Sequence, residues 1–129
     1  MADRRELAAI AAGGFLGAVA RTALADALPA SPDAWPWATF VVNLAGAFVL
    51  GYAVVLLQER LPLSAYRRPF IGTGFCGALT TFSTMQIELI RMLDAHAYVL
   101  ATTYAAASIA GGLACVLLAA NVVRRVRLA

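Results

Sequence analysis

Apolar residues fill four long stretches of the chain, and polar residues gather in the short segments between them. The stretches are Leu7–Ala25, Thr39–Leu57, Pro69–Leu93 and Tyr98–Val123. A helix needs about 20 mostly apolar residues to cross the hydrocarbon of a bilayer, and each stretch meets that requirement. The pattern therefore predicts an all-α membrane protein with four transmembrane helices, which occupy residues 1–129 as a single domain.

The segments between the stretches carry signals that end helices. Asp26–Ala38 contains three prolines together with Trp35 and Trp37. We expect the first helix to stop there and both indoles to lie at the level of the lipid headgroups. The second connection covers residues 59–68. The third, Asp94–Ala97, is so short that the last two helices should be antiparallel neighbours.

The composition excludes several classes of protein. Hydrophobic residues make up 62% of the chain and charged residues 13%, whereas soluble domains have about 45–50% and about 25%. A soluble enzyme, a disordered chain and a nucleic-acid binder are therefore excluded. The sequence also lacks a catalytic triad, a phosphate-binding loop and paired carboxylates, so no enzyme is predicted. Cys76 and Cys115 sit in apolar runs and are expected to pack as small apolar residues.

The basic residues, all of them arginines, are unevenly placed along the chain. With four helices, both termini and the second connection lie on one side of the membrane. That side carries eight arginines, and the other carries two, Arg21 and Arg91. Because cytoplasmic segments are rich in basic residues, both termini should be cytoplasmic. The eight are Arg4, Arg5, Arg60, Arg67, Arg68, Arg124, Arg125 and Arg127.

The first stretch admits two interpretations. Two arginines before an apolar run, with small residues at positions 23–25, are typical of a signal peptide. Gly13 and Gly17, however, form the small-residue pattern by which membrane helices pack closely. Arg21 would also interrupt the apolar run just before any cleavage site. We therefore favour a retained helix.

The third stretch is poorly suited to a continuous helix. Gly72, Gly74 and Gly77 are followed closely by Leu79–Thr84, which reads LTTFST. Gly costs about 1 kcal/mol relative to Ala in a helix interior, and Thr is also disfavoured. One interpretation is a helix broken near its middle, whose freed carbonyls can hold Na⁺. The other is a glycine-rich packing face whose hydroxyls bond to the preceding turn.

Polar residues inside the other stretches are functional candidates, because polar groups are costly in hydrocarbon. Thr39 and Asn43 lie one turn apart on the second helix, and Tyr104 and Ser108 repeat that spacing on the fourth. An intramembrane Asn either joins helices or lines a path for a polar solute. Glu88, on the third helix, should either pair with an arginine or take a direct functional role.

Phe82 is a further candidate, although contact with core or lipid is the simpler interpretation. An aromatic ring has a positive edge, so an anion can approach its C–H rim without meeting a full positive charge. Such a contact is weak. Weak contacts suit permeation, because an ion must bind well enough to enter and still leave quickly.

Three motifs in these stretches resemble the Fluc/CrcB family of fluoride channels. They are Gly14-x-x-Gly17-Ala18-x-x-Arg21, Thr39-x-x-Val42-Asn43-Leu44-x-Gly46-x-Phe48-x-x-Gly51 and Gly74-Phe75-x-Gly77-x-Leu79-Thr80-Thr81-Phe82-Ser83-Thr84. The resemblance implies that two four-helix subunits assemble as an antiparallel, dual-topology dimer. It further implies two narrow pores that export fluoride passively across the prokaryotic cell membrane, the inner or plasma membrane.

The resemblance assigns pore roles to residues that the polar pattern had already singled out. It implies Asn43 as an amide donor to fluoride and Phe82 as an aromatic contact for the anion. It implies Thr39, Tyr104 and Ser108 as a polar track. The two lines of reasoning therefore point to the same set of side chains.

The resemblance also implies one cofactor, a structural Na⁺ at the centre of the dimer. The backbone carbonyls of Gly77 and Thr80 would hold it. This implication favours the broken helix over the packing face. Arg21, Thr81 and Glu88 are further candidate site residues.

Two positions depart from the family's pattern. Met85 stands where a second pore Phe is usual, and Gly112 stands where the polar track often continues with Ser. Met can fill the space but offers no positive C–H rim. We therefore expect slower permeation or a Phe supplied by a partner subunit. The uneven arginines favour one orientation and pairing with an oppositely oriented paralogue; the alternative is a homodimer.

Two other functional classes fit a chain of this size. A proton-coupled small multidrug transporter needs a carboxylate at the membrane centre, but the first stretch has none deeper than Glu6. A non-transporting assembly subunit would explain the glycine-rich faces. It would not explain the aligned polar residues of the second and fourth helices, so the fluoride channel remains the favoured hypothesis.

Overall fold

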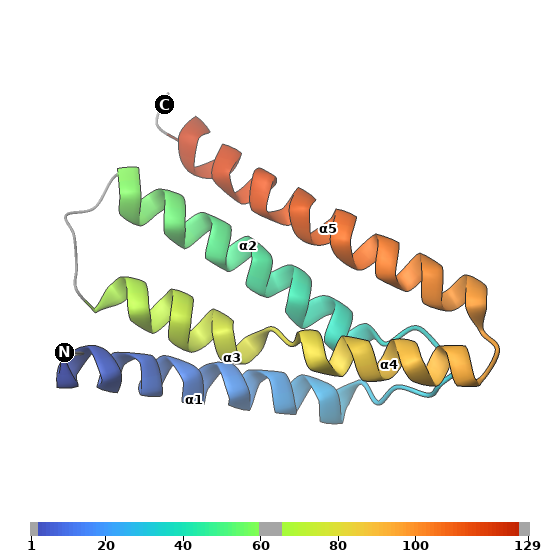
Figure 1. Ribbon diagram of the computed structural model, residues 1–129. Coiled ribbons are helices and arrows are strands. Elements are labelled where there is room, and N and C mark those ends of the chain that lie inside the picture. Colours follow the sequence, from blue (N-terminus) through green and yellow to red (C-terminus); the bar gives the residue numbers. More distant parts are fainter. Residues whose placement is uncertain (1–2, 60–65, 127–129) are drawn as a thin grey trace.

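The computed structural model describes residues 3–59 and 66–126, and these residues form helices joined by short connections (Figure 1). The elements are α1 (Arg4–Ala27), α2 (Trp37–Glu59), η1 (Pro69–Cys76), α3 (Gly77–Leu79), α4 (Phe82–Asp94) and α5 (Tyr98–Arg125). Three of them, α1, α2 and α5, are long and apolar enough to cross a membrane. The helices predicted for the first, second and fourth stretches are therefore confirmed, each extending two or three residues beyond at least one predicted end.

The third predicted stretch has a different structure from the other three. The π-helix η1 and the single turn α3 precede two non-helical residues, Thr80 and Thr81, after which α4 begins. We call these two residues the Thr80–Thr81 link. None of the three helical pieces is long enough by itself to cross a membrane.

The helices run back and forth along one common direction. In Figure 1, α1 lies beside η1 and α3, while α2 lies beside α5. The start of α1, the end of α2, the start of η1 and the end of α5 lie at one end of the molecule. The connection over residues 28–36 and the turn at 95–97 lie at the other.

Glycines bring the backbones of α1 and η1 into direct contact. A methyl group added at Gly13 would collide with the Phe70 carbonyl, and one at Gly17 would collide with the Phe75 carbonyl. From the other side, a methyl at Gly74 would lie 2.5 Å from the Ile10 carbonyl oxygen. The prediction that Gly13 and Gly17 form a packing pattern is therefore confirmed.

A compact core cluster lies where α4, α5 and the connection over residues 28–36 meet. It contains Met85, Met92, Ala101 and Tyr104, and Trp35 packs against it. Trp35, predicted to lie at the level of the lipid headgroups, is half-buried because its ring packs on Tyr104.

Other sequence predictions concern single residues. Trp37 is 56% exposed, Cys76 is buried and Cys115 is half-buried, and both cysteines are free thiols. Both cysteines therefore lie on helical segments and pack as small apolar residues, as predicted. Arg60 and Arg127, which enter the arginine count, lie outside the described residues.

Candidate functional site

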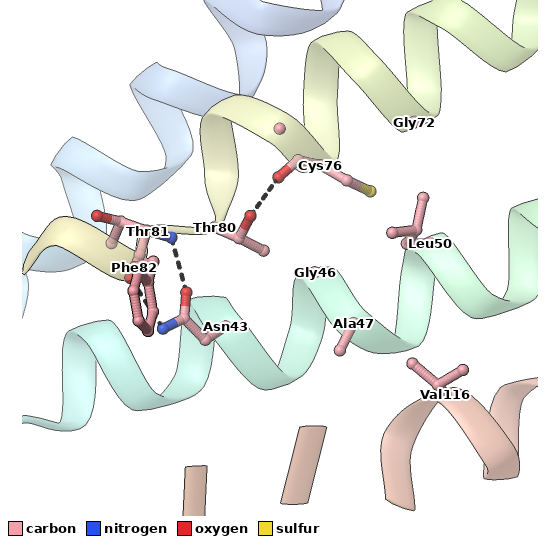
Figure 2. Close-up of a pocket in the computed structure, with 11 residues that line it drawn as sticks. Asn43, Gly46, Ala47, Leu50, Gly72, Cys76, Thr80, Thr81, Phe82 and Val116 are labelled. Carbon is pink, nitrogen blue, oxygen red and sulfur yellow. Dashed lines mark hydrogen bonds between the residues drawn. The ribbon is translucent and has the colours of Figure 1, made fainter. Parts of the chain in front are cut away.

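The Thr80–Thr81 link is held open by a side chain from α2. Both residues have extended backbones, with φ −78° and ψ 151° at Thr80 and φ −148° and ψ 113° at Thr81. The Asn43 Nδ2 donates to the Thr81 carbonyl over 3.1 Å, and the Thr81 N–H donates to Asn43 Oδ1 over 2.8 Å (Figure 2). The Asn43 amide thus replaces the helical partners that Thr81 gives up.

In this arrangement, two carbonyl groups of the third stretch lose their usual hydrogen-bond donors. In a continuous α-helix, the N–H of Thr81 would bond to the Gly77 carbonyl and the N–H of Thr84 to the Thr80 carbonyl. Instead, Thr81 N–H is bonded to Asn43, and Thr84 N–H donates to Thr81 Oγ1 over 3.2 Å. The carbonyl oxygens of Gly77 and Thr80 are therefore left without their usual donors and can serve as ligands.

The Thr80 side chain and a glycine of α2 shape the link further. The Thr80 hydroxyl donates to the Cys76 carbonyl over 2.8 Å, which turns its methyl group away toward α2. A methyl added at Gly46 would collide with that Thr80 Cγ2. The close approach of α2 to the link therefore requires glycine at position 46.

A cavity of about 410 Å³ opens at the link (Figure 2). Gly77 is exposed there, and a methyl group added to it would meet only the Gly72 carbonyl oxygen, at 3.8 Å. The Phe82 side chain is 67% exposed at the same cavity. The lining residues are Asn43, Gly46, Ala47, Leu50, Gly72, Cys76, Gly77, Thr80, Thr81, Phe82 and Val116.

A second polar cluster surrounds Glu88 on α4. The Thr39 hydroxyl donates to Glu88 Oε1 over 2.6 Å, and the Tyr104 hydroxyl donates to Oε2 over 2.7 Å. Tyr104 is fully buried and Thr39 is 5% exposed. Hydrogen bonds to an ionised carboxylate are strong, and here each oxygen has one. Of the two roles considered for Glu88, pairing with an arginine is not seen among the described residues, where its hydrogen-bond partners are these two hydroxyls.

A second cavity, of about 320 Å³, lies between α1, α2 and the start of α4. The half-buried Arg21 lines it together with the hydroxyls of Thr39, Thr81, Ser83 and Thr84. Guanidinium and hydroxyl groups are hydrogen-bond donors. Arg21 therefore offers an anion a positive charge together with N–H donors, whereas the hydroxyl hydrogens of Thr39 and Thr81 are already used on Glu88 and Thr84.

The remaining candidates lie apart from these two cavities. Met85 is 8% exposed and belongs to the core cluster with Tyr104. Ser108 has a buried hydroxyl without a hydrogen-bond partner among the described residues. At Gly112, an added methyl group would meet nothing within 4 Å.

The structure joins Glu88 to two residues that the sequence analysis had placed in a polar track. Thr39 and Tyr104, predicted as parts of one track, meet at Glu88. The sequence reasoning missed Ser83 and Thr84 as cavity residues. The available signal was Thr81, since threonine is a favoured N-cap residue and a cap there places Ser83 and Thr84 in the first turn of a helix.

The donor set of this site suits a hard cation rather than a transition metal. Within residues 3–59 and 66–126, no three or more His, Cys, Asp or Glu side chains converge. The available ligands are the carbonyl oxygens of Gly77 and Thr80. Oxygen ligands of this kind suit hard cations, so these two carbonyls fit the Na⁺ that the resemblance implies.

Long apolar helices, and polar groups that converge between them, define a small multi-pass α-helical membrane protein. The family model described as CrcB-like protein, Camphor Resistance (CrcB), matches residues 8–120. The chain belongs to this family, whose curated relatives carry the name fluoride-specific ion channel FluC.

Two mycobacterial relatives match almost the whole chain. One is fluoride-specific ion channel FluC 1 of Mycolicibacterium paratuberculosis, 58% identical over 97% of this chain and 95% of its own length. FluC 1 of Mycobacterium bovis is 56% identical over 98% of this chain and 96% of its own. A more distant relative, FluC of Chlorobaculum tepidum, is 44% identical over 82% of this chain and 84% of its own.

Proposed function

We propose that this chain forms a fluoride-specific channel through which F⁻ leaves the cytoplasm passively. Membership of the FluC family supports fluoride as the permeant anion and a membrane as the place where the protein acts. The observation that carries the proposal is the pair of cavities on either side of Thr81, one with Phe82 and Asn43 and the other with Arg21. An anion could pass between donors there without meeting a dense cluster of positive charge.

Asn43 and Phe82 would contact the anion in complementary ways. Asn carries two N–H donors, and Asn43 uses one on Thr81, which leaves the other without a partner among the described residues. The exposed ring of Phe82 can turn its positive edge toward a dehydrated anion. Both contacts are weak enough to let the ion leave.

The proposed fold is four membrane crossings, of which η1, α3 and α4 together make the third. On this view the Thr80–Thr81 link is a break at membrane depth. Non-helical backbone is tolerated there only where protein buries it or it lines a cavity. The hydrogen bonds from Asn43 and the adjoining cavity both meet that condition.

We propose that Na⁺ binds at the carbonyls of Gly77 and Thr80 and has a structural role. When bound, it would supply a fixed positive charge and hold the freed carbonyls in place. Two oxygens leave most of the coordination shell of a hard cation to be filled by other groups. Gly77 lies exposed at the open cavity, so an antiparallel second subunit placed there could complete the site.

The partner in the proposed dimer is a second copy of the chain, inserted in the opposite orientation. The second candidate is an oppositely oriented paralogue, which the eight-to-two distribution of arginines favours. Met85 also favours it, because the side chain lies in the core cluster and offers no aromatic edge.

Fluoride-electrode measurements of efflux from proteoliposomes test the channel. Replacing Phe82 by Ile should slow fluoride efflux about fivefold to tenfold, since an aromatic contact is worth about 1 kcal/mol. Phe15, which is 69% exposed on α1, provides the matched control: Phe15→Ile should leave efflux unchanged. Met85→Phe should keep or raise the rate.

Several results would count against these assignments. Equal rates for wild type and Phe82→Ile would remove the ring from the pathway. Chloride efflux as fast as fluoride efflux would contradict specificity. Wild-type vesicles that lose fluoride no faster than protein-free vesicles would contradict the homodimer, and recovery of efflux on adding a paralogue would support the heterodimer.

A further inference from the structure

Trp35 enters the bundle from the connection that precedes α2. Pro36, which follows it, is fully buried, and a proline restricts the preceding residue to extended backbone. The N–H of Trp37, where α2 begins, donates to the Trp35 carbonyl over 2.9 Å. The backbone of Trp35 is therefore constrained by the two residues that follow it.

The Trp35 ring packs edge-on against two aromatic rings of the core. Its centroid lies 5.4 Å from that of Tyr104, with the ring planes at 80°, and 5.2 Å from that of Phe40, at 84°. Edge-to-face pairs are worth about 0.5–1.5 kcal/mol beyond the area they bury, and they depend on ring orientation. Trp35 therefore favours one orientation of the Tyr104 ring.

The orientation of Tyr104 matters because its hydroxyl is one of the two donors to Glu88. That hydrogen bond spans 2.7 Å, and the ring is fully buried. A tilt of the ring would carry the hydroxyl away from Glu88 Oε2. The carboxylate would then keep Thr39 as its one described donor and could turn toward other groups.

The indole N–H of Trp35 takes no part in this arrangement. It is buried without a hydrogen-bond partner among the described residues. A buried donor without a partner costs free energy, so removing it is neutral or favourable. If the ring is what matters, Phe should replace Trp35 and Leu should not.

We infer that Trp35 is a positioning residue: its ring holds the Tyr104 hydroxyl on Glu88, whose other donor, Thr39, lines the cavity with Arg21, and it thereby sets the rate at which fluoride passes. The effect on fluoride rests on the proposed function. The effect on Tyr104 does not, so the two can be tested separately.

The first test observes Tyr104 directly by NMR of protein whose tyrosines carry ¹³C at the ring carbon bonded to oxygen. The shift of this carbon responds to the hydrogen bond of the hydroxyl, and the Tyr104→Phe variant identifies the signal. We expect one narrow signal in wild type and in Trp35→Phe. In Trp35→Leu it should broaden or move toward the signal of Tyr98, which is 56% exposed.

Trp37 supplies the matched control for this measurement. It is 56% exposed, and its ring contacts those of Trp35 and Phe40, at centroid distances of 6.0 and 6.1 Å, but not that of Tyr104. Trp37→Leu should leave the Tyr104 signal narrow and in place. A narrow, unmoved signal in Trp35→Leu would overturn the inference, whether or not the protein conducts fluoride.

The second test measures fluoride efflux in a double-mutant cycle. Trp35→Leu should slow efflux about fivefold in the wild-type background and Trp35→Phe should restore it. In the Tyr104→Phe background, Trp35→Leu should have no further effect, because the hydroxyl through which it acts is absent. The same fivefold loss in both backgrounds would show a merely structural role and would also overturn the inference.

Discussion

At the scale of the residue, Thr81 has two tasks that are usually divided between several residues. Its backbone N–H and C=O both bond to Asn43, so Thr81 leaves the helix with both of its own backbone groups satisfied. Its hydroxyl accepts from the N–H of Thr84 and caps α4. A β-branched residue adopts extended backbone readily, and a Thr hydroxyl is a good cap. Thr81 thus ends the link through its backbone and caps the next helix through its side chain.

Removing that hydroxyl should weaken the fold. Thr81→Val is expected to lower the free energy of unfolding by about 1 kcal/mol, the usual loss for a helix cap, as measured by denaturant titration in detergent micelles. Thr81→Ser keeps the hydroxyl and should stay within about 0.5 kcal/mol of wild type. The control Thr102→Val removes an exposed hydroxyl bonded to the Tyr98 carbonyl. An equal loss in both Val variants would contradict the capping role.

At His96, by contrast, a substitution should stabilise the fold. This residue lies two residues after the end of α4 and has a φ of 57°, and the N–H of the next residue, Ala97, donates to the Met92 carbonyl over 2.8 Å. This is the closing bond of a Schellman motif, in which glycine is preferred. His96→Gly should therefore raise the free energy of unfolding by about 0.5–1 kcal/mol, which is measured as a higher melting temperature. His96→Ala keeps the Cβ and should not; equal melting temperatures for both variants would contradict this account.

At the scale of the element, the contact between α1 and η1 depends on missing side chains. Gly13 and Gly17 face the carbonyls of Phe70 and Phe75, and Gly74 faces the backbone of α1 in return. No flexible side chain stands between the two backbones at these points. The fit is therefore intolerant of even one added methyl group.

Two neighbouring glycines allow a matched comparison. Gly13→Ala should destabilise the protein by about 1–3 kcal/mol or prevent its folding, because the new methyl would collide with the Phe70 carbonyl. Gly14→Ala places a methyl 3.8 Å from the Gly74 carbonyl oxygen, an ordinary contact. Since Ala favours a helix over Gly, that variant should equal or exceed wild type in thermal stability. Similar losses in both would contradict the packing argument.

At the scale of the whole molecule, the fold gathers arginines from three distant parts of the sequence. Arg4 and Arg5, at the start of α1, lie at the same end as Arg67 and Arg68, which precede η1 (Figure 1). Arg124 and Arg125 end α5 there as well, and Arg124 Nε lies 3.4 Å from Glu59 Oε1. The end that carries them should stay in the cytoplasm.

Adding arginines to the other end should weaken that preference. In a Ser31→Cys reporter, the fraction of copies labelled by an impermeant thiol reagent applied to intact cells measures this preference, because Ser31 is exposed in the connection between α1 and α2. Replacing Asp94 and Ala95 by Arg should lower the labelled fraction. Asp94→Asn should not, because the rule counts basic residues and not net charge. Labelling of about half the wild-type copies is expected for the proposed homodimer of opposite orientations, whereas labelling of most copies would favour the heterodimer.

The helices were predictable because their signal is local. An apolar stretch long enough for a membrane, bounded by prolines and charges, is sufficient to place α1, α2 and α5. The third stretch showed glycine and threonine in positions unfavourable to a helix. Its link nevertheless lies at Thr80 and Thr81 because Asn43, 38 residues away from Thr81, bonds to the backbone there.

The site was predictable as a set of residues and not as an arrangement. Spacing singled out Thr39, Tyr104 and Glu88, but a shared carboxylate flanked by two hydroxyls could not be inferred from it. Trp35 was assigned to the membrane surface because indoles prefer it. Its burial on Tyr104 depends on where the connection over residues 28–36 folds back, which no local pattern encodes.

The sequence by itself determined that the protein belongs in a membrane, where most of its helices lie, and which chemical groups it has available. These follow from the transfer of side chains out of water and from backbone preferences, which act residue by residue. The tertiary structure alone decided which donor meets which acceptor, which carbonyls lose their donors, and that Trp35 packs against Tyr104. Those outcomes depend on contacts between helices that are far apart in the chain, where a change of one methyl group at Gly13 or Gly46 alters the fit.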